Sequence, residues 1–529
     1  MRGIRQDTAQ GHAVAAALLG GDTRLVAGML VQNGPEAWIA FDKEVRRLHS
    51  ASSEPLRTDR IEARLCDPDG RVRGSALAES RRPPLQLVLV RCADWAPAVR
   101  GRARRVLGRA VAKDPAGALT ELTPLVLRLA RREHGDWALE QLEAALTGRY
   151  SLLAAWWRPG RPSTTWSWNS LTGRQRDGIL DRLRTSDDLP TRRFAARLTV
   201  AAGTVGVRDL ARHAAAERDP VTNRTWTDAA LAVMAADGPD DEAIDTLLGA
   251  GAPTVRAAGI TALRRAGRAA EAADHLADRS GAVRACARWL LRQDGGDPHA
   301  HYRGLVADPE HVSPHAVTGF AECARRGDAP LLAALLDHPA GPVRAAALAG
   351  LRHLHAAPGK AALLALLDDP SASVAREAAL CLRPAALQLD SGALAARTAP
   401  ERPLHTRRAA FQLLRVQGRI AALRAAVALS VHPDPGLRRV AVETVSIWNW
   451  SATLHAKQAD RAELGALLEA SAHVLRPEVL QLWRHRLGLN EEDRTEPDAR
   501  HEGPVRAARE GAMRWWRARR GLADRNYLA

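Results

Sequence analysis

The hydrophobic positions of the chain recur at the spacing of an α-helix, in segments separated by short turns. Residues 339–355 are a clear example, because the apolar side chains there fall on one face of a helix: Val343, Ala347, Leu351 and Leu354. A proline just before this stripe suits the first turn of a helix. Residues 356–360 break the pattern, and apolar positions resume over 361–369. The pattern predicts two helices joined by a turn.

This two-helix pattern recurs along the chain. Each copy has an apolar anchor early in its first helix, and the six clearest anchors are Val255, Val283, Val343, Val374, Thr406 and Leu437. They are spaced by 28, 60, 31, 32 and 31 residues, and a looser copy at 308–327 fills the long gap. Further copies are expected at 189–203, 219–235, 67–80 and 94–110. Because one hairpin cannot bury its own apolar face, the copies are expected to stack on one another.

The copies resemble HEAT repeats, in particular the short class found in phycobilisome-lyase-type proteins. In that pattern a turn aspartate precedes Val-Arg and an Ala/Leu stripe, as at Asp337, Val343, Arg344, Ala347 and Leu351, and again at Asp278, Val283, Arg284, Ala287 and Leu291. The likeness covers 187–450 well and 60–110 moderately. It implies an all-α, right-handed superhelical solenoid of repeats of about thirty residues. It implies little about function, because such arrays serve as scaffolds, transport factors, inhibitors and enzymes.

The pattern also predicts a domain organisation. We expect five parts: an irregular helical region at 1–153 with candidate repeats at 60–110, a Trp-rich loop and junction at 154–186, the repeat array at 187–487, an acidic linker at 488–504 and a basic tail at 505–529. The linker carries six acidic residues against two arginines, and the tail carries seven arginines against two acidic residues.

Composition adds a strong positive charge to this picture. The net charge is +16, and 46% hydrophobic with 26% charged residues is typical of a folded protein. Nearly all the basic residues are arginine, which partly reflects GC-rich coding in a bacterium, but the excess over acid predicts an acidic protein surface or a nucleic acid as partner. No stretch approaches 18 apolar residues, so no transmembrane segment is expected. The five scattered cysteines fit a reduced, cytoplasmic protein.

The arginines fall into two groups. Those that follow the anchors (Arg256, Arg284, Arg344 and Arg438) are interpreted first as a structural ladder to the aspartates of neighbouring turns. Binding candidates are sought off this consensus, in two clusters: Arg100, Arg104 and Arg105, and Arg408, Arg415 and Arg419. If such side chains lie on one surface, they would bind a polyanion with salt-sensitive affinity.

Tryptophan is unusually concentrated in two places. Four tryptophans lie between 156 and 168, and this stretch is interpreted first as a plug over the exposed end of the array. The alternative is a binding platform made of Arg158, Arg161, Trp166 and Trp168. In the tail, Trp515 and Trp516 stand among arginines. They could contact nucleic acid, fold back as a cap or touch an anionic membrane, the last being least favoured.

No motif points to catalysis. The chain has no recognisable nucleophile elbow, P-loop, dinucleotide-binding or zinc-protease motif, and no metal site or cofactor is expected. The preferred hypothesis is a non-enzymatic scaffold that engages an acidic partner through a basic, Arg-rich surface. The alternative comes from resemblance, since some HEAT-like arrays are DNA glycosylases acting on alkylated purines. Trp38 and Asp42 would then be the catalytic candidates, the carboxylate stabilising positive charge on the sugar. Bilin-lyase-like chemistry ranks lowest.

Overall fold

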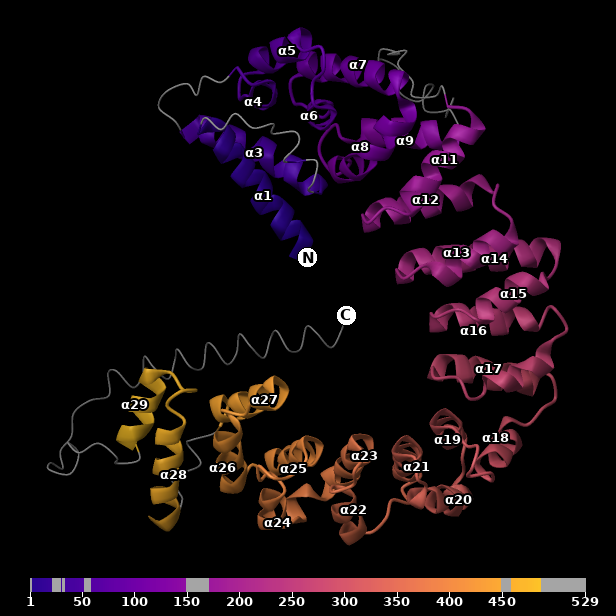
Figure 1. Ribbon diagram of the computed structural model, residues 1–529, viewed down its shortest axis with the longest axis vertical. Coiled ribbons are helices and arrows are strands. Elements are labelled where there is room, and N and C mark those ends of the chain that lie inside the picture. The colour runs from indigo at the N-terminus through magenta and orange to yellow at the C-terminus, as the bar shows by residue number, and fades with distance from the viewer. Residues whose placement is uncertain are drawn as a thin grey trace. The chain divides into compact units, whose positions relative to one another are not determined.

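The protein is described by a computed structural model over residues 2–20, 30, 34–51, 59–148, 171–448 and 458–486. Every regular element in these ranges is a helix (Figure 1). The chain divides into two compact units, Met1–His301 and Tyr302–Ala529. Each unit is a stack of helices in which neighbours along the chain pack against one another, so the prediction of an all-α solenoid of helical repeats is confirmed.

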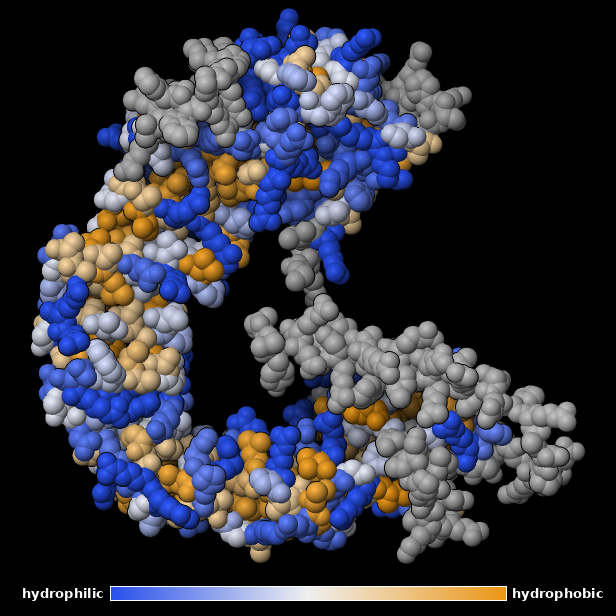
Figure 2. All heavy atoms as spheres, turned by 180° about the vertical axis from the view of Figure 1, so that it is seen from behind, coloured by the Kyte–Doolittle hydropathy of each residue, from blue (hydrophilic) through white to orange (hydrophobic). Residues whose placement is uncertain are grey.

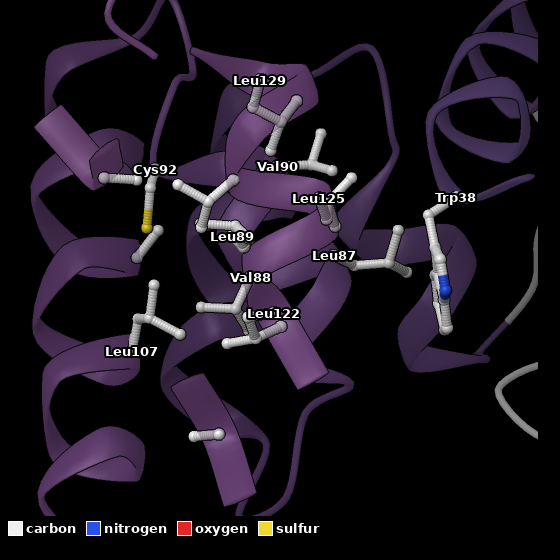
Figure 3. Packing of buried hydrophobic residues seen from close by; sticks show 14 of the residues in the cluster. Trp38, Leu87, Val88, Leu89, Val90, Cys92, Leu107, Leu122, Leu125 and Leu129 are labelled. Carbon is white, nitrogen blue, oxygen red and sulfur yellow. The ribbon is translucent and has the colours of Figure 1, made fainter. Parts of the chain in front are cut away.

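The first part of unit 1 packs around one helix that is buried on every side. Its helices are α1 (Arg2–Leu19), α3 (Pro35–Ala51), α4 (Ile61–Leu65), α5 (Gly70–Glu79), α6 (Leu85–Arg91), α7 (Pro97–Lys113), α8 (Pro115–Leu129) and α9 (Asp136–Thr147). All residues of α6 from Gln86 to Arg91 are buried. Figure 3 shows the side chains of α6 meeting leucines of α7 and α8, with Trp38 beside Leu87. A helix buried on every side has no single apolar stripe, which explains why the repeat phase is weak here.

Regular repeats fill the rest of unit 1. They comprise α11 (Gly173–Arg184), α12 (Leu189–Ala202), α13 (Val207–Ala216), α14 (Pro220–Asp237), α15 (Asp241–Leu248), α16 (Pro253–Leu263), η1 (Ala269–His275) and α17 (Gly281–Gln293). The unit boundary falls within α18 (Pro298–Val306). Turn aspartates start several of these helices, because the Asp188 and Asp219 side chains accept hydrogen bonds from the backbone N–H groups of Thr191 and Thr222.

Unit 2 continues the same plan. Its helices are α19 (Pro314–Ala321), η2 (Arg326–Asp328), α20 (Ala329–Ala334), η3 (Leu335–Asp337), α21 (Gly341–His353), α22 (Lys360–Leu366), α23 (Ala372–Leu382), η4 (Arg383–Gln388), α24 (Ser391–Ala396), α25 (Leu404–Gln417), α26 (Ile420–Leu429), α27 (Pro435–Ser446), α28 (Gln458–Ala470) and α29 (Pro477–Arg486). In Figure 1 the first helices of the repeats, α19, α21, α23, α25 and α27, form one row, and the intervening helices form a second. The helix pair predicted over 339–369 is confirmed as α21 and α22.

Arginines after the anchors join consecutive repeats. Nη1 of Arg344 donates to the carbonyls of His338 (2.8 Å) and Pro339 (3.0 Å) in its own turn. Its Nε and Nη2 donate to Asp369 in the next turn, at 3.1 and 2.7 Å. Arg256 binds its own turn and Asp278 in the same way. The predicted structural ladder is therefore confirmed for these two arginines.

A basic groove in unit 2 and the other candidate sites

The first predicted arginine cluster, on α7, does not form a shared surface. Nη1 of Arg100 donates to the carbonyls of Asp94 (2.7 Å) and Trp95 (3.3 Å), six and five residues earlier, as the ladder arginines do. Arg104 is half-buried, donates to the carbonyl of Cys92 and lies over the ring of Trp137, 4.6 Å from its centroid. Of the three, Arg105 alone is exposed. Arg100 thus binds the carbonyls of its own turn, as Arg256 and Arg344 do.

The tryptophan-rich candidates cannot be placed. Both the platform (Arg158, Arg161, Trp166 and Trp168) and the tail pair (Trp515 and Trp516) lie outside the described residues. The plug and platform interpretations of 154–170 therefore remain predictions.

Trp38 and Asp42, the candidates for the glycosylase alternative, are buried in unit 1. The Asp42 carboxylate accepts hydrogen bonds from Nε of Arg46 at 3.2 Å and from Nη2 of Arg91. Burial raises the pKa of Asp42, and the charges of Arg46 and Arg132 oppose that rise. A carboxylate enclosed in ion pairs would have to break them before it could stabilise charge on a bound sugar. This geometry does not favour the glycosylase alternative.

The second predicted arginine cluster lines a large groove in unit 2. A hollow of about 1330 Å³ lies over α23, α25 and α27, with Arg419 at the start of α26 and Leu464 of α28 at its edges. Its five lining arginines are Arg376, Arg383, Arg408, Arg415 and Arg419, and no described lining residue is acidic. We call this hollow the basic groove. The structure thus brings Arg408, Arg415 and Arg419 together, as their sequence cluster suggested.

Sequence inspection missed two of these arginines, Arg376 and Arg383. They stand two and nine residues after the anchor Val374, and Arg408 and Arg415 stand two and nine residues after the anchor Thr406. Seven residues span two helical turns, so each pair lies on one face of its helix. Because α23 packs directly against α25, the four side chains line one hollow. The sequence signal for Arg376 and Arg383 is that they occupy the same repeat positions as Arg408 and Arg415.

Apolar side chains lie among the arginines of the basic groove. Leu380, Val416 and Ile447 are 38%, 41% and 63% exposed, respectively, and all three line the hollow. Figure 2 shows hydrophobic side chains (orange) between hydrophilic ones (blue) in the lower part of the view, where α19–α26 lie. Trp448 also lines the hollow, and its buried indole Nε1 has no hydrogen-bond partner among the described residues. The groove therefore combines cationic and apolar groups.

The arginines of the basic groove differ in how far they are already paired. Nη2 of Arg408 donates to Asp434 at 2.7 Å, and Arg376 lies 3.5 Å from Glu377. Backbone hydrogen bonding and the nearby Arg408 guanidinium lower the pKa of Asp434, so this pair stays charged. Arg419 donates to the carbonyl of Leu387 at 3.0 Å. No ion pair joins Arg383, Arg415 or Arg419 to an acidic side chain within the described ranges.

Other kinds of site have less support among the same residues. No group of three or more His, Cys, Asp or Glu side chains there is placed to hold a metal ion. None of the helices with described residues has the length and apolarity to span a membrane. None of the five cysteines forms a disulfide, and burial raises the pKa of the Cys92 thiol well above its usual range. The basic groove is therefore the best-supported candidate site.

Comparison with known proteins leaves the groove without a described counterpart. No protein-family model matches the chain, and no curated protein matches it. Among solved structures, yeast importin-β (Kap95p) aligns with a TM-score of 0.33 and 12% identity, over 91% of this chain and 63% of that one. A Kap121p mutant aligns with a TM-score of 0.22 and 12% identity, over 94% of this chain and 52% of that one. The chain thus spans less than two thirds of either structure, and likeness this distant carries no function.

Proposed function

We propose that the protein is a binding scaffold and that the basic groove binds an acidic, partly apolar segment of another protein. The observation that carries the proposal is the lining of the groove, in which five arginines and no described acidic residue surround exposed apolar side chains. The guanidinium of Arg383, which has no acidic partner among the described residues, can bind a carboxylate through two parallel hydrogen bonds.

The apolar surface favours a protein over a nucleic acid. A polynucleotide backbone would match the arginines but leave Leu380, Val416 and Ile447 facing phosphates and sugars. Single-stranded nucleic acid is usually held by stacking of bases on aromatic rings, and Trp448 is the one aromatic residue among the described lining residues. An acidic segment that also carries leucine or valine would satisfy both kinds of surface.

The proposal is tested by fluorescence anisotropy with the full chain. The probe is a labelled peptide of about twenty residues that mixes glutamate and leucine, and single-stranded and duplex DNA of similar charge are the competitors. We expect the peptide to bind, and we expect affinity to fall as salt is raised from about 50 to 300 mM, because screening weakens charge attraction. If DNA binds more tightly than the peptide, the ligand of the groove is a nucleic acid and not an acidic protein segment.

A matched pair of double variants locates the site. Arg383→Glu with Arg415→Glu reverses two charges in the groove, and we expect peptide affinity to fall at least about tenfold. Arg182→Glu with Arg218→Glu changes the net charge equally at exposed positions of unit 1 and should change affinity less than about twofold. Equal losses in the two double variants would mean that net charge, not the groove, attracts the peptide.

A further inference from the structure

Arginine recurs at one fixed position of the repeat. The basic groove does not explain this recurrence, because it includes only two of these arginines, Arg383 and Arg415. We number each first helix from its anchor, the third residue after the N-cap, such as Val374 after Ser371 in α23. Nine residues after the anchor, six successive repeats from α16 to α25 have an arginine: Arg264, Arg292, Arg325, Arg352, Arg383 and Arg415. Five of them lie in the last turn or at the C-cap of the first helix, whereas Arg325 lies four residues beyond the end of α19. We call these the row arginines; two belong to unit 1 and four to unit 2.

Contacts show that the row arginines project toward the next first helix in the stack. Nη2 of Arg352 on α21 donates to Glu377 on α23 at 3.3 Å. In unit 1 the guanidinium of Arg264, at the end of α16, lies over Trp289 of α17, 5.4 Å from the ring centroid. Arg383 and Arg415, from α23 and α25, line the same hollow. Within each unit the row therefore follows the stacking direction of the helices.

Helix electrostatics provide a competing explanation. The position lies at the carboxyl end of the first helix, where the helix dipole favours a cation. That effect acts over the whole last turn and does not select one position. The row ends at α25, since α27, which also lines the basic groove, carries Ser446 at the equivalent place. A ligand that runs along the stack accounts for the constant position.

The spacing of the row arginines points to the shape of that ligand. Packed helices lie about 8–10 Å apart, so successive row arginines in unit 2 follow at about that interval. A polyproline II chain rises about 3.1 Å per residue with three residues per turn, so every third side chain points the same way about 9.3 Å along. An α-helical ligand would need every seventh residue, at about 10.5 Å, and would drift out of register over several repeats.

We infer that unit 2 binds an extended acidic chain in the polyproline II conformation, with a carboxylate at every third residue facing the row arginines. The residues between the carboxylates would contact Leu380 and Val416. Arg352 would share its charge between Glu377 and the ligand, whereas Arg383 and Arg415 have no acidic partner among the described residues. This inference rests on the proposed function and specifies the segment that the groove takes.

Three synthetic peptides test the register with the full chain. The first contains four Glu-Pro-Leu repeats, and the second has the same composition with the four glutamates in one block. The third is an alanine- and leucine-rich helix with four glutamates at every seventh position. We expect the first to bind about tenfold more tightly than the second in anisotropy titrations. Equal affinities of the first two, or tightest binding of the helix, would overturn the inference. If none of the three binds, and the glutamate–leucine peptide also fails, the proposed function fails with it.

Two single variants distinguish the contribution of a row arginine from that of any positive charge in the groove. Arg383→Gln removes a row arginine, and Arg376→Gln removes a lining arginine of the same helix that lies off the row. We expect Arg383→Gln to weaken the spaced peptide about fivefold or more and the block peptide about twofold. Arg376→Gln should weaken both about equally. Loss of helix stability in Arg383→Gln without any change in the preference for the spaced peptide would assign the row to the helix dipole instead.

Discussion

Two arginine-rich regions of this protein use the same side chain in opposite ways. In unit 1, Arg73 and Arg91 are buried together with Asp42 and Asp94, a set we call the buried ionic cluster. Asp94 accepts hydrogen bonds from Nε and Nη2 of Arg73 at 2.9 and 2.8 Å, and Nη1 of Arg91 lies 3.2 Å away. In the basic groove of unit 2, Arg383 is exposed and has no acidic partner among the described residues.

Burial and pairing therefore decide the role of an arginine here, not its place in a basic cluster. A buried guanidinium must keep its carboxylate, because an uncompensated charge in the interior is costly. Such an arginine is committed to the fold. An exposed arginine without an acidic neighbour loses little by binding a ligand carboxylate, so it is available for function.

The largest effect is expected in the buried ionic cluster. Asp94→Asn removes the carboxylate shared by Arg73 and Arg91 and leaves two buried cations with one acid, so we expect a loss of about 3–5 kcal/mol in unfolding free energy. Urea unfolding followed by circular dichroism measures it. Asp434→Asn is the control, since its pair with Arg408 is partly exposed and asparagine still caps α27; its loss should stay below about 1 kcal/mol. Similar losses in the two variants would contradict the comparison.

The ladder should give an intermediate effect. Arg256→Gln removes hydrogen bonds to two turn carbonyls and to Asp278, and we expect a loss of about 2 kcal/mol. Arg264→Gln changes an exposed arginine at the end of the same helix and removes only its contact with the Trp289 ring, so it should cost less than about 1 kcal/mol. Hydrogen exchange of α16 and α17 localises the loss. If both variants kept the wild-type unfolding free energy, the ladder hydrogen bonds would not stabilise the fold.

A smaller loss of stability is expected when Asp219 is protonated at low pH. The hydrogen bond from Arg193, with the backbone and side chain of Thr222, lowers the pKa of Asp219 in the folded state, although partial burial opposes this. A lowered folded pKa contributes stability that is present above the unfolded value of about 3.8 and is lost as pH falls toward the folded value. Because Arg193 is partly exposed, we expect the lowered pKa of Asp219 to contribute about 1 kcal/mol to the unfolding free energy. Unfolding midpoints from pH 6 to 2.5 should fall less steeply for Asp219→Asn than for the wild type.

The smallest effect on stability is expected in the basic groove. Arg383→Glu with Arg415→Glu changes side chains without acidic partners in the described structure, so the unfolding free energy should stay within about 0.5 kcal/mol of wild type. The same variant is expected to lose peptide binding, the reverse of Asp94→Asn. Thermal unfolding and anisotropy on one preparation measure both quantities. If the double variant is destabilised, these arginines stabilise the fold and are not kept only for binding.

Much of the fold could be predicted because the repeat is regular. The stripe of Val343, Ala347 and Leu351 determined a helix and its buried face, and all three side chains are buried. The ladder interpretation of Arg256 and Arg344 followed from their place beside the anchors. The region around α6 was harder to interpret, since a helix buried on every side leaves no periodic signal.

The candidate site was predicted in part. Arg408, Arg415 and Arg419 lie close in sequence and line one groove, but Arg376 and Arg383 come from a neighbouring repeat and complete it. Arg100 was assigned to a binding cluster, yet it donates to the carbonyls of its own turn as the ladder arginines do. Local sequence shows which side chains share a helix face and does not show which carboxylate lies opposite them.

The sequence by itself determined the helices, their stacking order and the positive charge, because these depend on periodicity and composition within about thirty residues. Only the tertiary structure decided which arginines are committed to the fold and which remain available. That choice depends on burial and on partners such as Asp94 for Arg73, 21 residues away, or Asp369 for Arg344, 25 residues away. Electrostatic pairing acts through space, so helices must pack before an arginine is either neutralised or left open to a ligand.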